Sequence, residues 1–306
     1  MGSNNTTNKK QMKVSHSIET ATCSKCELCV TICPSRIIVK TPNGEIKFQP
    51  DRIPICIHCG HCMAMCESKS ILIDGISYSD NFRELPQVSM DHEVLMNFLL
   101  TRRSVREFKN KPVPREVIEK ILEVISTAPF GVSPDNVEIT AVTDKTLIEQ
   151  AAPEMSKVYV QLEKAMKIPF LGWIIRKSMP KEAGKTVMNF IVPHLAMEMY
   201  KFKDGVDDIA RNAPALIFFH APKGAEEHTV DAHIYLTYAL LAVHSLGLGA
   251  TTIGLIGPAI NQSKQLRLLF GIPSGNEVVE SMILGYPKLH FKRAIIRPRK
   301  KVRYLS

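Results

Sequence analysis

The spacing of apolar residues predicts two helices near the middle of the chain. The first begins near Ser89 or Asp91, either of which suits an N-cap, and ends around Thr101. Its apolar face consists of Val94, Leu95, Phe98 and Leu99. A second, amphipathic helix follows residues 112–114, and Pro114 suits its first turn. Its apolar positions are Val117, Ile118, Ile121, Leu122 and Ile125.

Strand and helix patterns follow one another through the rest of the sequence. Strands are predicted at residues 137–143, 214–220 and 278–284. Residues 145–210 are predicted to be mostly helical, with interruptions at Pro153, Pro169, Pro180 and Pro193. Residues 233–247 are apolar nearly all round, which predicts a buried helix that ends at Gly247 or Gly249. A loop at 250–255 and a short helix at 264–270 are expected after it.

The longest apolar region, residues 234–260, is interrupted by His244, Ser245 and four glycines. This pattern suits a buried helix with a following loop better than a membrane span. Residues 1–13 are polar and lack the apolar core of a signal peptide. We therefore expect a cytoplasmic protein with no membrane partner.

All eight cysteines lie between Cys23 and Cys66, in two runs that share the spacing C-x2-C-x2-C-x3-C. The first run is Cys23, Cys26, Cys29 and Cys33, and the second is Cys56, Cys59, Cys62 and Cys66. This spacing is typical of proteins with two [4Fe–4S] clusters, in which the fourth cysteine of each run ligates the other cluster. Disulfides and structural zinc are the alternatives, but the regular short intervals favour clusters.

Residues 20–80 resemble the bacterial-type two-cluster ferredoxins. The resemblance implies that Cys23, Cys26, Cys29 and Cys66 hold one cluster, and that Cys56, Cys59, Cys62 and Cys33 hold the other. Short β-like segments at 37–40, 45–48 and 71–73 fit this fold. His58 and His61 lie between ligands, and we interpret them as polar residues of the cluster loop.

Length leaves room for a second domain. We predict a flexible tail at 1–20, the iron–sulfur domain at 21–80, a linker at 81–89 and a larger domain at 90–306. The formal net charge is +9, and many of the basic residues lie in the last twenty positions. No nucleic-acid motif accompanies them, so we expect no nucleic-acid partner.

Three arginines and a serine follow the first predicted helix as Arg102, Arg103, Ser104 and Arg106. Arginine offers forked donors that suit a phosphate, and serine adds another donor. Basic residues are also common at helix ends because they complement the helix dipole. By itself, this cluster is therefore weak evidence for a phosphate site.

Residues 90–300 resemble the nitroreductase family of flavoproteins. The matching segments, in order, are RRSVREF at 102–108, Ala128-Pro129 before a strand, Asn212-Ala213-Pro214, LGLG at 246–249 before residues 250–254, and LGYP at 284–287. The resemblance implies an α+β fold: an FMN domain with a central sheet and surrounding helices, in which FMN lies at the interface of an interlocked homodimer.

The resemblance also implies which residues bind FMN. Arg102, Arg103, Ser104 and Arg106 would hold its phosphate and ribityl chain, with help from Arg293 or Arg297. The backbone of Ile253, Gly254 and Leu255 would approach the flavin N5 edge. Pro129 and Ser133 belong to a loop that differs from the usual family sequence Asn-x-Gln-Pro-Trp. The effect of residues 133–136 on FMN contacts and on substrate preference is therefore open.

Two functions follow from this combination. The first is an oxidoreductase that passes electrons from the clusters to FMN and then to a nitroaromatic, a quinone or an activated alkene, with a ferredoxin-type donor or NAD(P)H. The alternative is a relay that delivers electrons to a partner protein. The apolar segment 168–175, which contains Trp173, bears on this choice as an active-site lid, as core or as a dimer interface. No catalytic acid is evident in the sequence.

Overall fold

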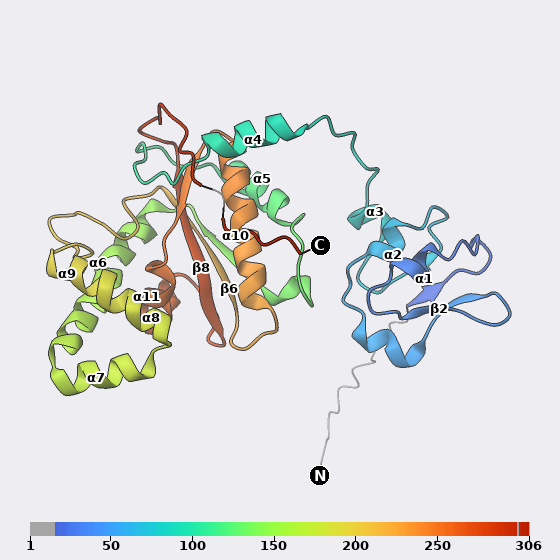
Figure 1. The fold of residues 1–306 in the computed structure, drawn as a ribbon, viewed down its shortest axis with the longest axis horizontal. Helices are drawn as coiled ribbons and strands as arrows, with labels where there is room; N and C mark the ends of the chain where they lie inside the picture. Colours follow the sequence, from blue (N-terminus) through green and yellow to red (C-terminus); the bar gives the residue numbers. More distant parts are fainter. Residues whose placement is uncertain (1–15, 299, 306) are drawn as a thin grey trace, which may run out of the picture. The chain divides into compact units, whose positions relative to one another are not determined.

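A computed structural model describes residues 16–298 and 300–305 of the chain (Figure 1). The chain divides into two compact units, Met1–Ser89 and Met90–Ser306. Most of the expected tail, residues 1–15, lies outside the described residues. The two units are described separately below.

The N-terminal unit contains two small antiparallel sheets. Strand β1 (Ser17–Ile18) pairs with β4 (Ile71–Leu72), and β2 (Ile38–Lys40) pairs with β3 (Ile46–Phe48). The predicted strands at 37–40, 45–48 and 71–73 are therefore present. The helical elements are α1 (Leu28–Ile32), η1 (Pro50–Ile55), α2 (His61–Ala64) and α3 (Tyr78–Asn81).

The pairing of β1 corrects the expectation that the tail extends to residue 20. Ser17 and Ile18 are aligned with Leu72 and Ile71, and the Glu19 N–H donates a further hydrogen bond to the Ser70 carbonyl. The sequence pattern did not indicate this strand because two residues are too few to show alternation. The pairing brings β1 against a core that includes Ile38, Ile46, Phe48, Met63 and Ile71.

The C-terminal unit is built on a four-stranded antiparallel sheet with the order β5-β6-β8-β7. The strands are β5 (Glu138–Val142), β6 (Ala215–Pro222), β7 (Gly249–Thr252) and β8 (Asn276–Gly285). The predicted loop at 250–255 is wrong for its first residues, because Ala250–Thr252 pair with β8. The other three strands agree with the sequence patterns.

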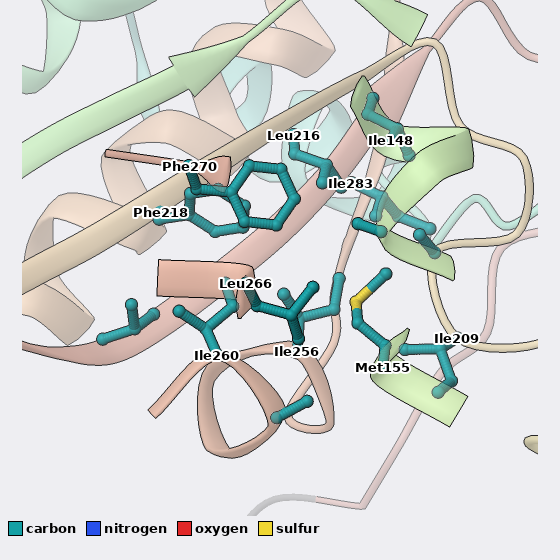
Figure 2. Close-up of a cluster of buried hydrophobic side chains, with 14 of the residues drawn as sticks. Ile148, Met155, Ile209, Leu216, Phe218, Ile256, Ile260, Leu266, Phe270 and Ile283 are labelled. Atoms are coloured by element: carbon teal, nitrogen blue, oxygen red, sulfur yellow. The ribbon is translucent and has the colours of Figure 1, made fainter. Parts of the chain in front are cut away.

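Helices cover both faces of this sheet, which explains why β6 is almost wholly apolar. Ala215, Ile217 and Phe219 pack in a cluster with α5 (Arg115–Ile125) and α10 (His228–Ser245). Leu216 and Phe218 point to the other face, where α6 (Lys145–Lys167), α11 (Ile256–Gln262) and α12 (Lys264–Leu269) pack (Figure 2). Successive strand residues face opposite sides of a sheet, so both faces need apolar residues.

The remaining helices connect these layers. Helix α4 (His92–Thr101) is capped by Asp91, whose side chain accepts a hydrogen bond from the Val94 N–H. The other elements are η2 (Pro134–Asn136), α7 (Pro169–Ser178), α8 (Lys181–Thr186), the π-helical η3 (Val187–Ile191) and α9 (Val192–Ala196). Pro153 and Pro193 lie inside α6 and in the first turn of α9, so neither interrupts a helix as predicted. No helix among the described residues is long and apolar enough to cross a membrane.

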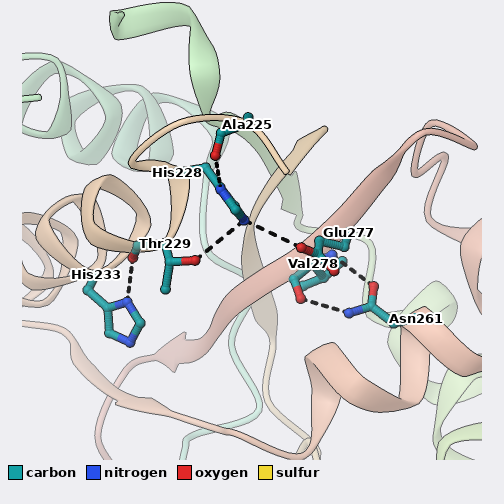
Figure 3. Close-up of polar contacts among 7 residues, drawn as sticks. All are labelled: Ala225, His228, Thr229, His233, Asn261, Glu277 and Val278. Carbon is teal, nitrogen blue, oxygen red and sulfur yellow. Dashed lines mark hydrogen bonds and ion pairs between the residues drawn. The ribbon is translucent and has the colours of Figure 1, made fainter. Parts of the chain in front are cut away.

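Polar contacts fix the start of β8 to two helices (Figure 3). The Asn261 side chain accepts from the Val278 N–H at 2.8 Å and donates to the Val278 carbonyl at 2.9 Å, like a neighbouring strand. His228, at the start of α10, contacts the Glu277 carboxylate at 3.4 Å and the Ala225 carbonyl. These contacts fix the positions of α10 and α11 relative to the sheet.

Candidate functional site

The eight cysteines form two groups of four, each around its own cavity. One cavity is lined by Cys23, Cys26, Cys29 and Cys66. The other is lined by Cys33, Cys56, Cys59 and Cys62. We call these groups the first and second thiol sets. Each set takes three cysteines from one run and the fourth from the other run, as the ferredoxin resemblance implies.

The thiols in both sets are crowded together and partly removed from water. Burial raises the pKa of the Cys29 thiol to about 11, and the nearby Cys66 adds to the effect. Burial likewise raises the pKa of Cys62 to about 12, with Cys33 among the groups that repel its thiolate. Four thiolates in such a cavity require a cation among them, and iron in a cluster supplies that charge. All eight cysteines are free of disulfides. The residues therefore fit two [4Fe–4S] clusters.

The C-terminal unit brings the predicted cationic residues together. A cavity of about 230 Å³ is lined by Arg102, Arg103, Ser104, Arg106 and Arg297, with Phe291 and Ile295. We call this the cationic groove. Arg297 lies far from the other arginines in the sequence, and the C-terminal segment places it there. Arg293, its predicted alternative, does not line the groove.

Charge in the groove is not balanced by acidic residues. Among the described residues, none of the four arginines forms an ion pair. Burial lowers the pKa of Arg102, and the neighbouring charges of Arg103 and Arg297 lower it further. The buried Nε of Arg103 has no hydrogen-bond partner within the described chain. An anion would satisfy this donor and offset the repulsion, so the groove fits the phosphate of FMN.

Local backbone pairing explains how the arginine segment is held. Ser104 forms a parallel bridge with Ala250 of β7, and the Val105 N–H donates to the Ala250 carbonyl at 3.0 Å. Gly249 permits this approach, because a Cβ atom there would lie 2.6 Å from the Val105 side chain. The segment therefore continues the edge of the sheet beside β7.

A second cavity of about 230 Å³ shares Arg102, Arg103 and Phe291 with the cationic groove. Its wall includes His244, which accepts or donates a hydrogen bond with the Thr101 hydroxyl at 2.8 Å. Other lining residues absent from our predictions are Leu240, Leu248, Pro287, Leu289 and His290. His244 interrupts a long apolar region of the sequence, which could have indicated a functional role. No sequence signal marked Pro287, Leu289 and His290 as lining residues.

The predicted residues 253–255 lie outside both cavities. The Ile253 N–H and carbonyl are bonded to Ser281, and the Leu255 carbonyl accepts a hydrogen bond from Tyr159. Space remains at Gly254, since a Cβ built there would have no atom within 4 Å. Hydrogen bonds therefore hold this turn in place, and free space remains beside Gly254.

The predicted loop residues Pro129 and Ser133 line neither cavity. The loop is tied instead to α10, because the Gly131 N–H donates to the buried Asp231 carboxylate at 2.9 Å. Asn136 donates to the Glu226 carbonyl at 3.0 Å. Within a single protomer, the structure therefore does not join this loop to the cationic groove.

Segment 168–175 is not core. Phe170 and Trp173 of α7 are 72% and 52% exposed, respectively. Of the three interpretations offered by the sequence, an active-site lid and a dimer interface remain.

Comparison with known proteins agrees with this architecture. Residues 99–286 match the sequence profile described as the nitroreductase family. This chain belongs to the nitroreductase family. Residues 15–67 match the profile described as the 4Fe-4S dicluster domain. Both expected resemblances are therefore confirmed: the chain is an oxidoreductase of the nitroreductase family preceded by an iron–sulfur domain.

Individual relatives are distant. Iodotyrosine deiodinase 1 from Rattus norvegicus is 23% identical over 218 residues, which cover 70% of each chain. A putative NADH dehydrogenase/NAD(P)H nitroreductase from Methanothermobacter thermautotrophicus is 25% identical over 197 residues, covering 63% of this chain and 77% of the relative. The crystal structure of a Bacteroides fragilis nitroreductase with bound FMN has a TM-score of 0.52 and 18% identity, covering 69% of this chain and 98% of that one. This likeness confirms the fold.

Proposed function

We propose that this protein is an iron–sulfur flavoprotein oxidoreductase. Electrons would pass from two [4Fe–4S] clusters to FMN and on to a small electrophilic substrate, such as a nitroaromatic, a quinone or an activated alkene. The observation that carries the proposal is the pairing, in one chain, of two four-thiol sets with an unneutralised cationic groove in a nitroreductase-family unit. When bound, FMN accepts electrons singly and delivers them in pairs, so it suits one-electron donors such as the clusters.

The residues of the groove would bind the acidic end of FMN. Arg102, Arg103, Arg106 and Arg297 would neutralise the phosphate, and the unpartnered Arg103 Nε would gain an acceptor. The Ser104 hydroxyl would donate a hydrogen bond to the phosphate or the ribityl chain. Arg293 remains a candidate for the same role in a second protomer.

The backbone at Ile253, Gly254 and Leu255 would border the flavin ring. The Tyr159 and Ser281 hydrogen bonds hold this turn in place, and the glycine leaves space for close approach. Pro129 and Ser133 would reach the cofactor across the interface of a homodimer, since their loop does not join the groove within one protomer. Support for a dimer comes from family resemblance and from the exposed apolar face of α7.

The electron donor divides the proposal into two versions. A ferredoxin-type protein would deliver electrons to the clusters, whereas NAD(P)H would reduce the flavin directly. The dicluster domain supports the first version. The name of the Methanothermobacter relative supports the second. Because clusters and free thiols must be kept from oxidation, we expect the protein in a reducing compartment such as the cytoplasm.

An anaerobic cofactor count tests the proposal. FMN, iron and acid-labile sulfide should be measured per chain, together with the visible spectrum before and after chemical reduction. About one FMN with about eight irons is the expected result. Iron without flavin would refute the role of the cationic groove. Reoxidation of the reduced protein only by a protein acceptor, and not by a small nitroaromatic, would favour the relay alternative.

A further inference from the structure

His16 lies in the N-terminal unit as a buried side chain without a hydrogen bond. It is 8% exposed, and neither ring nitrogen has a partner among the described residues. The residue directly precedes β1, and the pairing of β1 with β4 holds it against the unit. Burying two ring nitrogens without partners costs free energy, so a hydrogen-bond partner for at least one of them is expected nearby.

Such a group is present in the second thiol set. A ring nitrogen of His16, the Sγ of Cys56 and a ring nitrogen of His58 all lie within 4.8 Å of one another. The His16 ring stands edge-on to Phe48, with centroids 5.3 Å apart, and Phe48 belongs to the buried core. The ring is therefore held in place beside the sulfur.

The three groups have the composition of a metal site, but Cys56 is already a member of a set of four thiols. His16 and His58 consequently lie just outside a ligand of the second cluster. A neutral imidazole carries one N–H donor.

We propose that His16 donates an N–H hydrogen bond to the Cys56 sulfur when the second cluster is bound, and thereby raises the reduction potential of that cluster. The inference rests on the proposed function, because it requires Cys56 to ligate a cluster. Reduction makes a cluster more negative, and a donor at a ligand sulfur stabilises the reduced form. His16 is thus a positioning residue that makes the second cluster easier to reduce.

The first thiol set provides an internal reference. There the Cys66 sulfur lies 3.6 Å from the Ser68 hydroxyl, and no histidine faces this set among the described residues. A change at His16 should therefore affect one cluster and leave the other unchanged.

Anaerobic redox titration followed by electron paramagnetic resonance tests this inference. In His16→Phe, which keeps a ring but removes the donor, one cluster should be about tenfold less reduced at a fixed potential, a shift of about 59 mV for a one-electron couple. The other cluster should keep its potential, and iron should stay at about eight per chain. His61→Phe, a change at an exposed histidine outside this group of three, is the control and should change neither potential. Full iron content with both potentials unchanged in His16→Phe would overturn the inference.

A second measurement covers the case in which His16→Phe loses its cluster. Wild-type protein labelled with 15N-histidine should show a weak histidine 15N coupling in the pulsed spectrum of the reduced clusters. The coupling should persist in His58→Ala. A wild-type protein with about eight irons and no histidine coupling would overturn this inference alone, whereas absence of iron would overturn the proposed function as well.

Discussion

The two units assemble their candidate sites in different ways. The thiol sets come from one short stretch, in which each run of cysteines supplies three ligands and exchanges the fourth. The cationic groove joins Arg102–Arg106 to Arg297, at opposite ends of the C-terminal unit. Local spacing therefore determines the first kind of site, whereas the second depends on the sheet that holds its parts together. Mutations should affect the two kinds of site differently.

The largest effect is expected from paired cysteine substitutions, which test how the ligands are shared. Cys33→Ser with Cys59→Ser removes two ligands from the second thiol set only. We expect about four irons per chain to remain, because the first cluster keeps all its ligands. Cys33→Ser with Cys26→Ser removes one ligand from each set and should lower iron further. Iron and sulfide analysis measures both.

Those two variants also serve as controls for each other, since each contains two substitutions and shares Cys33→Ser. Equal iron contents in the two proteins would contradict the crossed assignment. The C-terminal unit has its own core and should keep its melting transition in both.

The next largest effect is expected in the cationic groove. Arg103→Ala removes a guanidinium whose buried Nε has no hydrogen-bond partner among the described residues. A hydrogen bond to a charged group is worth about 1.5–3 kcal/mol, so FMN affinity should fall by about tenfold to a hundredfold. Fluorescence titration of the apoprotein with FMN measures the change. Arg115→Ala is the control, because Arg115 is exposed and pairs with Glu119 of the same helix, α5.

Equal loss of FMN affinity in both arginine variants would indicate a general effect of charge rather than a phosphate site. Arg297→Ala sharpens the test, because the sequence pattern did not distinguish Arg297 from Arg293 as the C-terminal arginine of the groove. Arg293→Ala should weaken FMN binding less than Arg297→Ala, because Arg297 lines the groove and Arg293 does not.

A smaller effect is expected where the sheet supports the groove. In Gly249→Ala the new Cβ would lie 2.6 Å from Val105, which must move away. Overpacking of this kind costs about 1–3 kcal/mol, and the melting temperature of the C-terminal unit should fall by several degrees. Calorimetry measures this shift.

Gly275→Ala is the matched control for Gly249→Ala. A Cβ at residue 275 has no atom within 4 Å, and this residue precedes β8 in the same sheet. Its melting temperature should be unchanged or slightly raised. A stable Gly249→Ala protein with normal FMN binding would show that the edge pairing does not position the arginines.

The smallest effect is a pH dependence from His220, which is buried in β6 between Thr140 and Asn276. Burial lowers its pKa; the nearby Glu138 opposes this shift, whereas Arg267 adds to it. His220 therefore binds a proton more readily in the unfolded chain than in the folded protein. The free energy of unfolding should consequently be highest above pH 6.5 and should fall as the pH decreases through the lower pKa of folded His220. Urea unfolding between pH 7 and pH 5 should show a shallower decline in His220→Gln than in the wild type. His92→Gln, a change at an exposed histidine of the same unit, serves as the control and should follow the wild type.

The same comparison explains how much the sequence could predict. The thiol sets could be predicted because ligand spacing is local, and the strands of the central sheet could be predicted from their apolar patterns. Strand β7 was missed because Ala250–Thr252 show no alternation, and they become a strand only by pairing with β8. His16 was placed in a tail for a similar reason, since only the distant β4 orders it.

The groove shows the limit for residues far apart in sequence. The arginines at 102–106 were evident as a cluster, but the choice between Arg293 and Arg297 depended on how the C-terminal segment packs. His244 and Phe291 line the adjoining cavity because of tertiary contacts that no local pattern contains. In our proposal the loop with Pro129 and Ser133 contacts FMN from a second protomer. Local sequence patterns within one chain could not predict that contact.

The most direct test of the proposed function is a rapid-mixing experiment that follows both kinds of cofactor. Protein containing FMN and iron is fully reduced without oxygen and mixed with a nitroaromatic, and the flavin and cluster absorbances are recorded together. We predict that both absorbances return to the oxidised state in the same reaction, because the clusters supply electrons to the flavin. Reoxidation of the flavin while the clusters stay reduced would contradict the account.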